Sequence, residues 1–194
     1  MPAWSKFFDR DKKVLVQAFT SPDPAQILCA SHRQIERALA SLARIARESC
    51  GDSLSDPRAF SAALRFVRLV APEHSAAEEE AVFPRLHRSV PSGNKDVRQL
   101  IDNLEEEHGC ADRAYQEVNR LGESWLAHGT LSPAHTSRLI SMLEGLAGLY
   151  DRHIQLEETE VFPLQAETLE SADLASLGEE LERRHLTVEE SFAK

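Results

Sequence analysis

The feature that most constrains this chain is a motif that occurs twice along its sequence. Residues 74–84 read HSAAEEEAVFP and residues 153–163 read HIQLEETEVFP, so histidine, two glutamates, phenylalanine and proline recur at identical offsets. A further histidine precedes each copy at a similar distance, 42 residues for His32 and 45 residues for His108. The repetition predicts two similar helix pairs, related by a pseudo-twofold axis, that place matching residues around one centre.

Turn-forming residues divide the chain into five helical segments. Proline near the first turn opens three of them, and glycine closes two. The expected segments run from Pro24 to Cys50, from Asp56 to Val90, from Lys95 to His128, from Ser132 to Thr168, and from Ala172 to Phe192. Aromatic residues make up only 6% of the chain, and no stretch alternates with period two. The fold class is therefore expected to be all-α.

The first four segments carry apolar stripes at three- and four-residue spacing, which is typical of amphipathic helices. Four such helices with short connections predict an up-down four-helix bundle. We expect the bundle to span residues 23–168. A short N-terminal arm at 1–22 and a C-terminal helix at 169–194, packed on the bundle, complete the organisation.

Each of the four stripes contains one histidine, and two stripes also contain a glutamate one turn later. A lone histidine in a stripe is usually a hydrogen-bonded core residue, but a buried unpaired carboxylate costs several kcal/mol. Two buried glutamates facing four histidines need a common partner, and a pair of divalent metal ions supplies it. The candidate ligands are His32, His74, Glu78, His108, His153 and Glu157. Each carboxylate has two oxygens, so each glutamate could bridge two metals and leave open positions for a small molecule.

These residues resemble the haemerythrin-like family, the HHE cation-binding domains, over roughly residues 24–166. The resemblance implies two non-haem iron ions, joined by an oxo or hydroxo bridge. It also implies that the four histidines are terminal iron ligands and that Glu78 and Glu157 are bridging carboxylates. The layout is most similar to the domain of bacterial di-iron proteins linked to nitrosative stress and iron–sulfur cluster repair.

Two departures from that family bear on the expected activity. Asp112 stands where the oxygen-carrying haemerythrins have a second histidine on the third helix, which puts oxygen carriage in doubt. Only about 20 residues precede the first helix, whereas the repair proteins usually carry a cysteine-containing N-terminal domain. The expected function is thus a di-iron protein that binds or reacts with NO, O₂ or peroxide, in nitrosative or oxidative stress, with oxidoreductase-like activity left open.

Other functions remain as alternatives. One is an iron- or oxygen-sensing module without catalysis, whose last helix moves with metal occupancy and which acts through a homodimer or a partner protein. A ferritin-like oxidase is disfavoured, because Glu105-x-x-His108 fits its Glu-x-x-His pattern but the doubled motif is His-x3-Glu. A metal-free structural bundle leaves the buried carboxylates unexplained.

Composition excludes some partners and favours a compartment. The net charge is −10 and no block is rich in Lys or Arg, which argues against nucleic acid and anionic membrane surfaces. No apolar run approaches the length of a membrane span or a secretory signal. The three cysteines include no CxxC pair, so a reducing, cytoplasmic setting is expected.

Several residues near the candidate ligands have an open role. Glu36 and Asp112 lie one turn after His32 and His108. Each could accept a hydrogen bond from an imidazole N–H or be an exposed charge on its helix. Glu79 and Glu158 are expected to be solvated neighbours of the bridging glutamates. Tyr150 is either a hydrogen-bond donor to a small ligand or an ordinary core residue. Cys29 is either a small buried hydrophobic residue or a redox group.

Overall fold

The computed structural model describes residues 22–50, 52–90 and 94–193, so the expected arm at 1–22 lies outside the described residues except for Pro22. The described part of the chain is helical and contains no strand, which confirms the all-α prediction. Its α-helices are α2 (Pro24–Ser49), α3 (Pro57–Ala77), α4 (Phe83–Ser89), α5 (Lys95–His128), α6 (Pro133–Leu156), α7 (Phe162–Thr168) and α8 (Ser171–Ala193). Two five-residue π-helical turns, η1 (Glu78–Val82) and η2 (Glu157–Val161), join α3 to α4 and α6 to α7.

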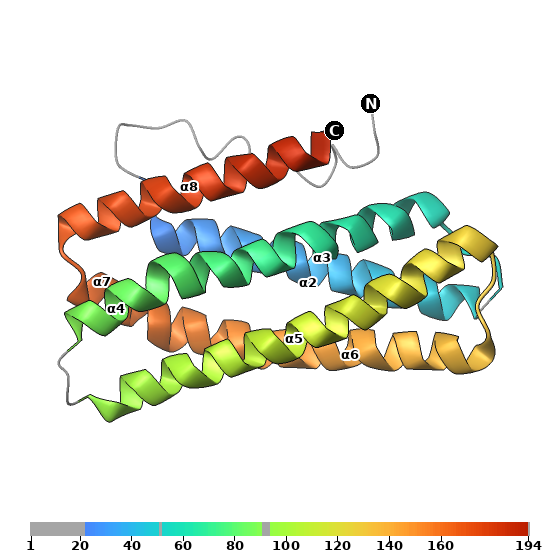
Figure 1. Cartoon of the computed structure of the whole chain (residues 1–194), viewed down its shortest axis with the longest axis horizontal. Coiled ribbons are helices and arrows are strands. Elements are labelled where there is room, and N and C mark those ends of the chain that lie inside the picture. Colours follow the sequence, from blue (N-terminus) through green and yellow to red (C-terminus); the bar gives the residue numbers. More distant parts are fainter. Residues whose placement is uncertain (1–21, 51, 91–93, 194) are drawn as a thin grey trace.

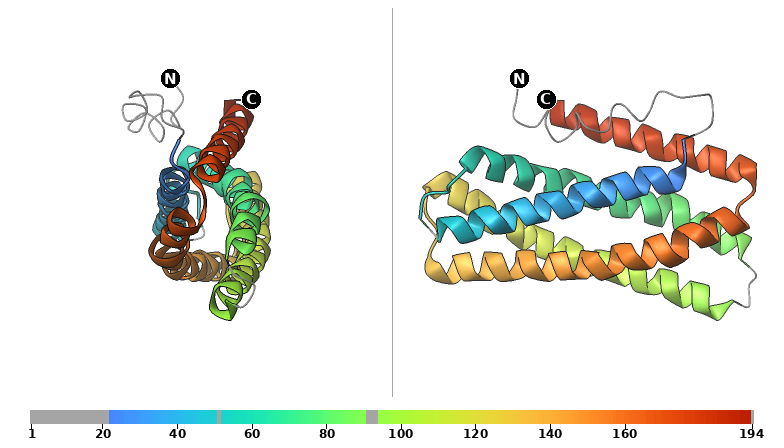
Figure 2. Two further views of the ribbon diagram at one scale, coloured as in Figure 1. Left: turned by 90° about the vertical axis from the view of Figure 1, so that its left-hand side faces the viewer. Right: turned by 180° about the vertical axis from the view of Figure 1, so that it is seen from behind.

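The helices form an up-down bundle of four long rods, as Figures 1 and 2 show. The rods are α2, α3 continued by η1 and α4, α5, and α6 continued by η2 and α7. Around the bundle, α2 packs against α3 and α6, and α5 packs against the same two helices. The helix α8 lies along the outside of this bundle, against α2 and α3 (Figure 1).

Side-chain caps explain why the helices begin where the sequence predicts. Asp23, Asp56, Asn94 and Ser132 each accept a hydrogen bond from a backbone N–H in the first turn of α2, α3, α5 and α6. At the other end of α5, Gly129 adopts a positive φ of 76° and donates to the Trp125 carbonyl. Local capping thus fixes the lengths of the rods.

The apolar core is divided into two clusters along the bundle axis. One cluster contains Ile35, Ala71, Ala111 and Tyr150, and the other lies toward α4, α7 and α8. The six candidate ligands occupy the stripe positions between the two clusters, where each helix passes from one cluster to the other. The polar centre is therefore closed by apolar side chains at both ends.

A close backbone approach docks α8 on the bundle. Leu177 and Leu181 are buried in the core cluster near α4 and α7. On the same helix, a Cβ added to Gly178 would clash with the carbonyl oxygen of Pro22. Glycine at this position lets α8 lie directly against the chain that leads into α2.

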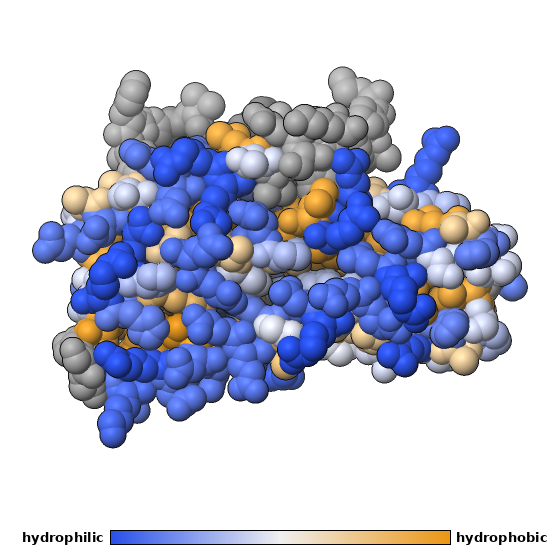
Figure 3. All heavy atoms as spheres, viewed as in Figure 1, coloured by the Kyte–Doolittle hydropathy of each residue, from blue (hydrophilic) through white to orange (hydrophobic). Residues whose placement is uncertain are grey.

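The face of the molecule seen in Figure 3 is mostly hydrophilic, with scattered apolar areas. Within the described ranges, Leu186 on α8 is the large hydrophobic side chain with high exposure, at 52%. None of the described helices combines the length and the apolar character needed to cross a membrane.

Candidate metal centre

The structure brings all six candidate ligands together in the middle of the bundle. Every bundle helix supplies one histidine, and the two π-helical turns supply one glutamate each. The six side chains belong to residues that are at most 5% exposed: His32, His74, Glu78, His108, His153 and Glu157. We call His32 and His74 the α2/α3 half of the centre, and His108 and His153 the α5/α6 half.

Each glutamate directs one carboxylate oxygen toward each half. Glu78 Oε1 lies 3.5 Å from His74 Nε2, and its Oε2 lies 3.3 Å from His108 Nε2. Glu157 Oε2 lies 3.0 Å from His32 Nε2, and its Oε1 lies 3.0 Å from His153 Nε2. Two groups of four ligand atoms result, each within 4.8 Å, and they share the two carboxylates. Each of the two groups could hold a metal ion.

Many of the inward-facing atoms have no aligned hydrogen bond. The four carboxylate oxygens of Glu78 and Glu157 are buried without a hydrogen-bond partner, and so are the Nε2 atoms of His32 and His74. The remaining two imidazoles face each other, with His108 Nε2 and His153 Nε2 3.0 Å apart. Buried polar atoms without a partner are costly unless an ion satisfies them, so the residues present fit a bound metal pair.

Burial and proximity separate the pKa values of the two carboxylates. Burial raises the pKa of Glu78 well above its usual range, and the neighbouring Glu157 raises it further. Burial alone would also raise the pKa of Glu157, but the imidazoles of His153 and His32 outweigh it and hold this pKa below its usual range. Without metal, the centre therefore retains protons that a bound cation would displace.

The π-helical turns place the two glutamates and arise from the proline in each motif. The N–H of Phe83 donates to the Glu78 carbonyl, five residues back, and the N–H of Phe162 donates to the Glu157 carbonyl in the same way. Pro84 and Pro163 follow directly; each lacks an N–H and would crowd the carbonyl four residues before it in a regular α-helix. The wider turn relieves this crowding, and the helices continue as α4 and α7. Such π turns are frequent at functional sites.

Carboxylates outside the centre hold three of the imidazoles by their Nδ1 atoms. The Nδ1 atoms of His32, His108 and His153 lie 3.0 Å, 2.9 Å and 2.8 Å from Glu158, Glu79 and Glu107, respectively. A carboxylate at Nδ1 fixes the proton there and leaves Nε2 free to bind a metal. Glu79 and Glu158 are partly solvated, as expected, with side chains 40% and 25% exposed, but each also contacts an imidazole.

The sequence reasoning assigned the outer carboxylates incompletely. Glu36 pairs with Arg33 instead of an imidazole, and Asp112 is exposed. Glu107 was not considered at all. The signals were present: Glu79 and Glu158 occupy the same offset in the two motif copies, and Glu107 directly precedes His108.

The motif phenylalanines cover the centre. Phe83 stacks on His108 with centroids 6.2 Å apart, and Phe162 stacks on His32 at 5.7 Å, both with an interplanar angle of 10°. Each motif copy therefore packs against the upstream histidine of the other helix pair. The two halves cannot form independently, because each uses residues from the other.

Two further residues lie near the centre. The ring of Tyr150 is 6.0 Å from that of His153, and the buried Tyr150 hydroxyl lies close to that of Tyr115. Cys29 lies near His32 and Glu158, and burial raises the pKa of its thiol to about 11. At neutral pH this cysteine is a protonated thiol, which makes it a poor nucleophile.

The chain matches the family model described as hemerythrin HHE cation binding domain over residues 23–164, and it therefore belongs to this family. Searches of curated proteins and of solved structures gave no significant match. The match confirms the family resemblance found in the sequence. With the buried His and Glu groups, it assigns the chain to a class of metal-binding proteins.

Proposed function

We propose that this member of the hemerythrin HHE cation-binding family is a non-haem di-iron protein whose centre binds or reacts with NO, O₂ or peroxide. The proposed ligands are His32, His74, Glu78, His108, His153 and Glu157. The observation that carries the proposal is the pair of buried glutamates, each with one oxygen directed toward each half of the centre.

Each metal would have four ligands from the protein, which leaves positions open for a reacting molecule and favours reaction over a purely structural role. Each half offers two imidazole nitrogens and two carboxylate oxygens, a mixture that suits iron. Iron bound there would supply open coordination positions and one-electron redox chemistry. The chain itself holds the imidazoles in the right tautomer through Glu79, Glu107 and Glu158, and Phe83 and Phe162 exclude water.

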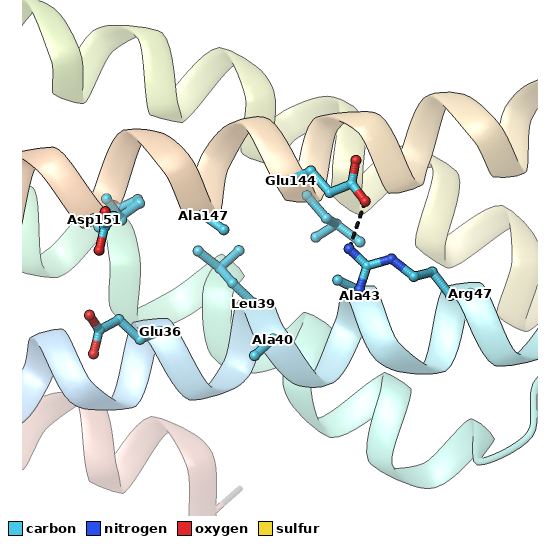
Figure 4. Close-up of a pocket in the computed structure, with 10 residues that line it drawn as sticks. Glu36, Leu39, Ala40, Ala43, Arg47, Glu144, Ala147 and Asp151 are labelled. Atoms are coloured by element: carbon cyan, nitrogen blue, oxygen red, sulfur yellow. Dashed lines mark hydrogen bonds and ion pairs between the residues drawn. The ribbon is translucent and has the colours of Figure 1, made fainter.

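A groove between α2 and α6 has room for a small ligand. It has a volume of about 340 Å³, and alanines 40, 43 and 147 line it because their short side chains leave the space open. Figure 4 shows Glu36 and Asp151 at one end and the Arg47–Glu144 ion pair, 2.6 Å long, at the other. Tyr150 forms part of the wall and also contacts the His153 ring. We propose this groove as the access route.

The charges along the groove favour a neutral ligand. Asp151 is acidic, whereas Glu36 pairs with Arg33 and Arg47 pairs with Glu144, so an anion entering here meets repulsion from Asp151. A neutral diatomic molecule or hydrogen peroxide does not. The Tyr150 hydroxyl lies close to that of Tyr115, and we propose that it donates a hydrogen bond to such a ligand beside His153.

An iron- or oxygen-sensing module is the second candidate, and one contact favours it. Arg184 on α8 pairs with Glu73 on α3 and with Glu80 inside η1. The last helix is thus tied to the turn that carries Glu78, so a change at the centre could reach α8. For either function, free thiols at Cys29, Cys50 and Cys110 fit a reducing compartment such as the cytoplasm.

The test is to load the protein anaerobically with Fe²⁺, measure iron per chain, and record optical spectra after oxidation and after adding NO to the reduced form. We expect two irons per chain and a new nitrosyl absorption, both lost in His74→Ala and Glu157→Ala. His135→Ala, at an exposed position of α6, is the control. Turnover of NO or peroxide on redox cycling favours catalysis, and binding without turnover favours sensing. A folded chain that takes up no iron contradicts the proposal.

A further inference from the structure

The two halves of the centre differ in the carboxylates that surround them. In the α5/α6 half, both imidazoles have a carboxylate at Nδ1: Glu79 for His108 and Glu107 for His153. No Lys or Arg of the described residues lies within ion-pair distance of Glu79 or Glu107. This half therefore has two outer carboxylates whose charge no side chain cancels.

The α2/α3 half has less negative charge around it. His32 has Glu158 at Nδ1, but no carboxylate of the described residues lies within ion-pair distance of His74 Nδ1. Arg33 is shared between two carboxylates: its Nη2 donates to both oxygens of Glu158 at 2.7 Å, and its Nη1 donates to Glu36. These three side chains leave one uncancelled negative charge beside this half, against two beside the α5/α6 half.

The sequence origin of the difference is one position at which the internal repeat breaks. The residue before His108 is Glu107, whereas the residue before His32 is Ser31. Glu107 reaches the imidazole of the neighbouring helix, and a serine is too short to do so.

We propose that the two metal positions are inequivalent. The α5/α6 half binds the first divalent cation more tightly than the α2/α3 half binds the second. This inference rests on the proposed two-metal centre. A carboxylate that accepts the Nδ1–H of a ligating imidazole makes the opposite nitrogen a stronger donor. Uncancelled negative charge nearby also favours a bound cation, and solvent screens part of this effect because Glu79 and Glu107 are 40% and 35% exposed.

The experiment titrates the metal-free full-length protein with Co²⁺ alone and follows both the heat and the visible absorption of the bound ion. Two separated steps are expected, each of one ion per chain. The substitution Glu107→Gln should lower the Co²⁺ affinity of the first step by about tenfold or more, which is the usual effect of losing such a partner. The affinity of the second step should not change. Glu158→Gln should act on the second step instead. Glu106→Gln, at an exposed position beside Glu107, is the matched control.

A variant with an effect of opposite sign makes the test sharper. Arg33→Gln leaves Glu158 unneutralised, so it should strengthen the second step and narrow the gap between the two affinities. A residue that only maintained structure would weaken binding when replaced. Two equal steps in the unmodified protein, or Glu107→Gln and Glu158→Gln acting on the same step, overturn the inequivalence alone. Uptake of a single Co²⁺ per chain overturns both the inequivalence and the two-metal proposal.

Discussion

Glu79 Oε1 lies 2.9 Å from His108 Nδ1, so the first motif copy supports a histidine of the second helix pair. The second copy does the same for the first pair, with Glu158 Oε1 3.0 Å from His32 Nδ1. The contacts of the two motif copies therefore explain the internal repeat. Each copy supplies a bridging carboxylate to the shared centre and an outer carboxylate to the opposite pair, which makes assembly of the two halves mutually dependent.

Replacing Glu157→Gln should remove metal binding and also destabilise the metal-free protein. The buried carboxylate lies 3.0 Å from both His32 and His153, and its loss leaves their charge uncompensated. Breaking a buried charge pair costs roughly 3–5 kcal/mol. Denaturant unfolding of the metal-free variant measures this loss. Glu160→Gln, exposed in the same π turn, should change the unfolding free energy little. Equal effects of the two substitutions contradict this account of the centre.

Filling the groove between α2 and α6 should slow ligand binding without removing the metal. Ala147→Trp places a large side chain at the groove wall seen in Figure 4, and we expect the rate of NO binding to the reduced protein to fall severalfold. Stopped-flow absorbance measures this rate, and metal content should stay unchanged. Ala134→Trp, exposed near the start of α6, is the control. An unchanged rate in Ala147→Trp means that the ligand takes another path.

The helices and the six inner residues could be predicted from the sequence because both depend on local signals. Caps and breakers such as Asp56 and Gly129 act within one turn, and they bound the rods where the structure has them. The spacing of His74 and Glu78 puts both on one helix face, and the repeat ties that face to its copy. The predicted bundle and the predicted convergence of side chains depend only on these features.

The outer carboxylates could not be predicted in the same way, because their partners lie on other helices. Glu107 contacts His153, which is 46 residues away, and on its own helix it occupies a partly exposed position. Whether it reaches that imidazole depends on how α5 and α6 are rotated against each other. The π turns could not be predicted either: Pro84 disfavours a regular α-helix, but only the structure shows that one turn widens and the helix continues.

Replacing Gly178→Ala should loosen α8 from the bundle. The new Cβ would clash with the Pro22 carbonyl oxygen, which is backbone and cannot rotate away. Overpacking of this kind typically costs about 1–3 kcal/mol. Thermal unfolding measures the loss, and proteolysis reports exposure of α8. Gly145→Ala is the matched control, because a Cβ there meets no atom within 4 Å and should be neutral or stabilising. A stability of Gly178→Ala equal to that of the control is incompatible with this docking contact.

The stability that the protein gains from metal binding should grow as pH rises. Burial lowers the pKa of His32 and His153, but Glu157 outweighs it and raises both above 6.5. A histidine with a raised folded pKa stabilises the fold below the unfolded pKa, and this stability is lost as pH rises through the folded value. Glu78 acts in the same sense, because its raised pKa makes ionisation costly in the folded state. His74, whose pKa burial lowers, opposes them.

Three of these four groups therefore reduce the stability of the metal-free protein as pH rises, and its Tm should fall between about pH 6 and pH 8. Glu157 does not alter this trend, because its lowered pKa contributes stability that is lost only in strong acid. Metal binding needs neutral imidazoles and ionised carboxylates, so the affinity rises over the same range. Differential scanning calorimetry with and without Fe²⁺ should show a metal-induced increase in Tm that grows with pH. An increase that stays constant or shrinks would mean that the cation displaces no protons from these residues.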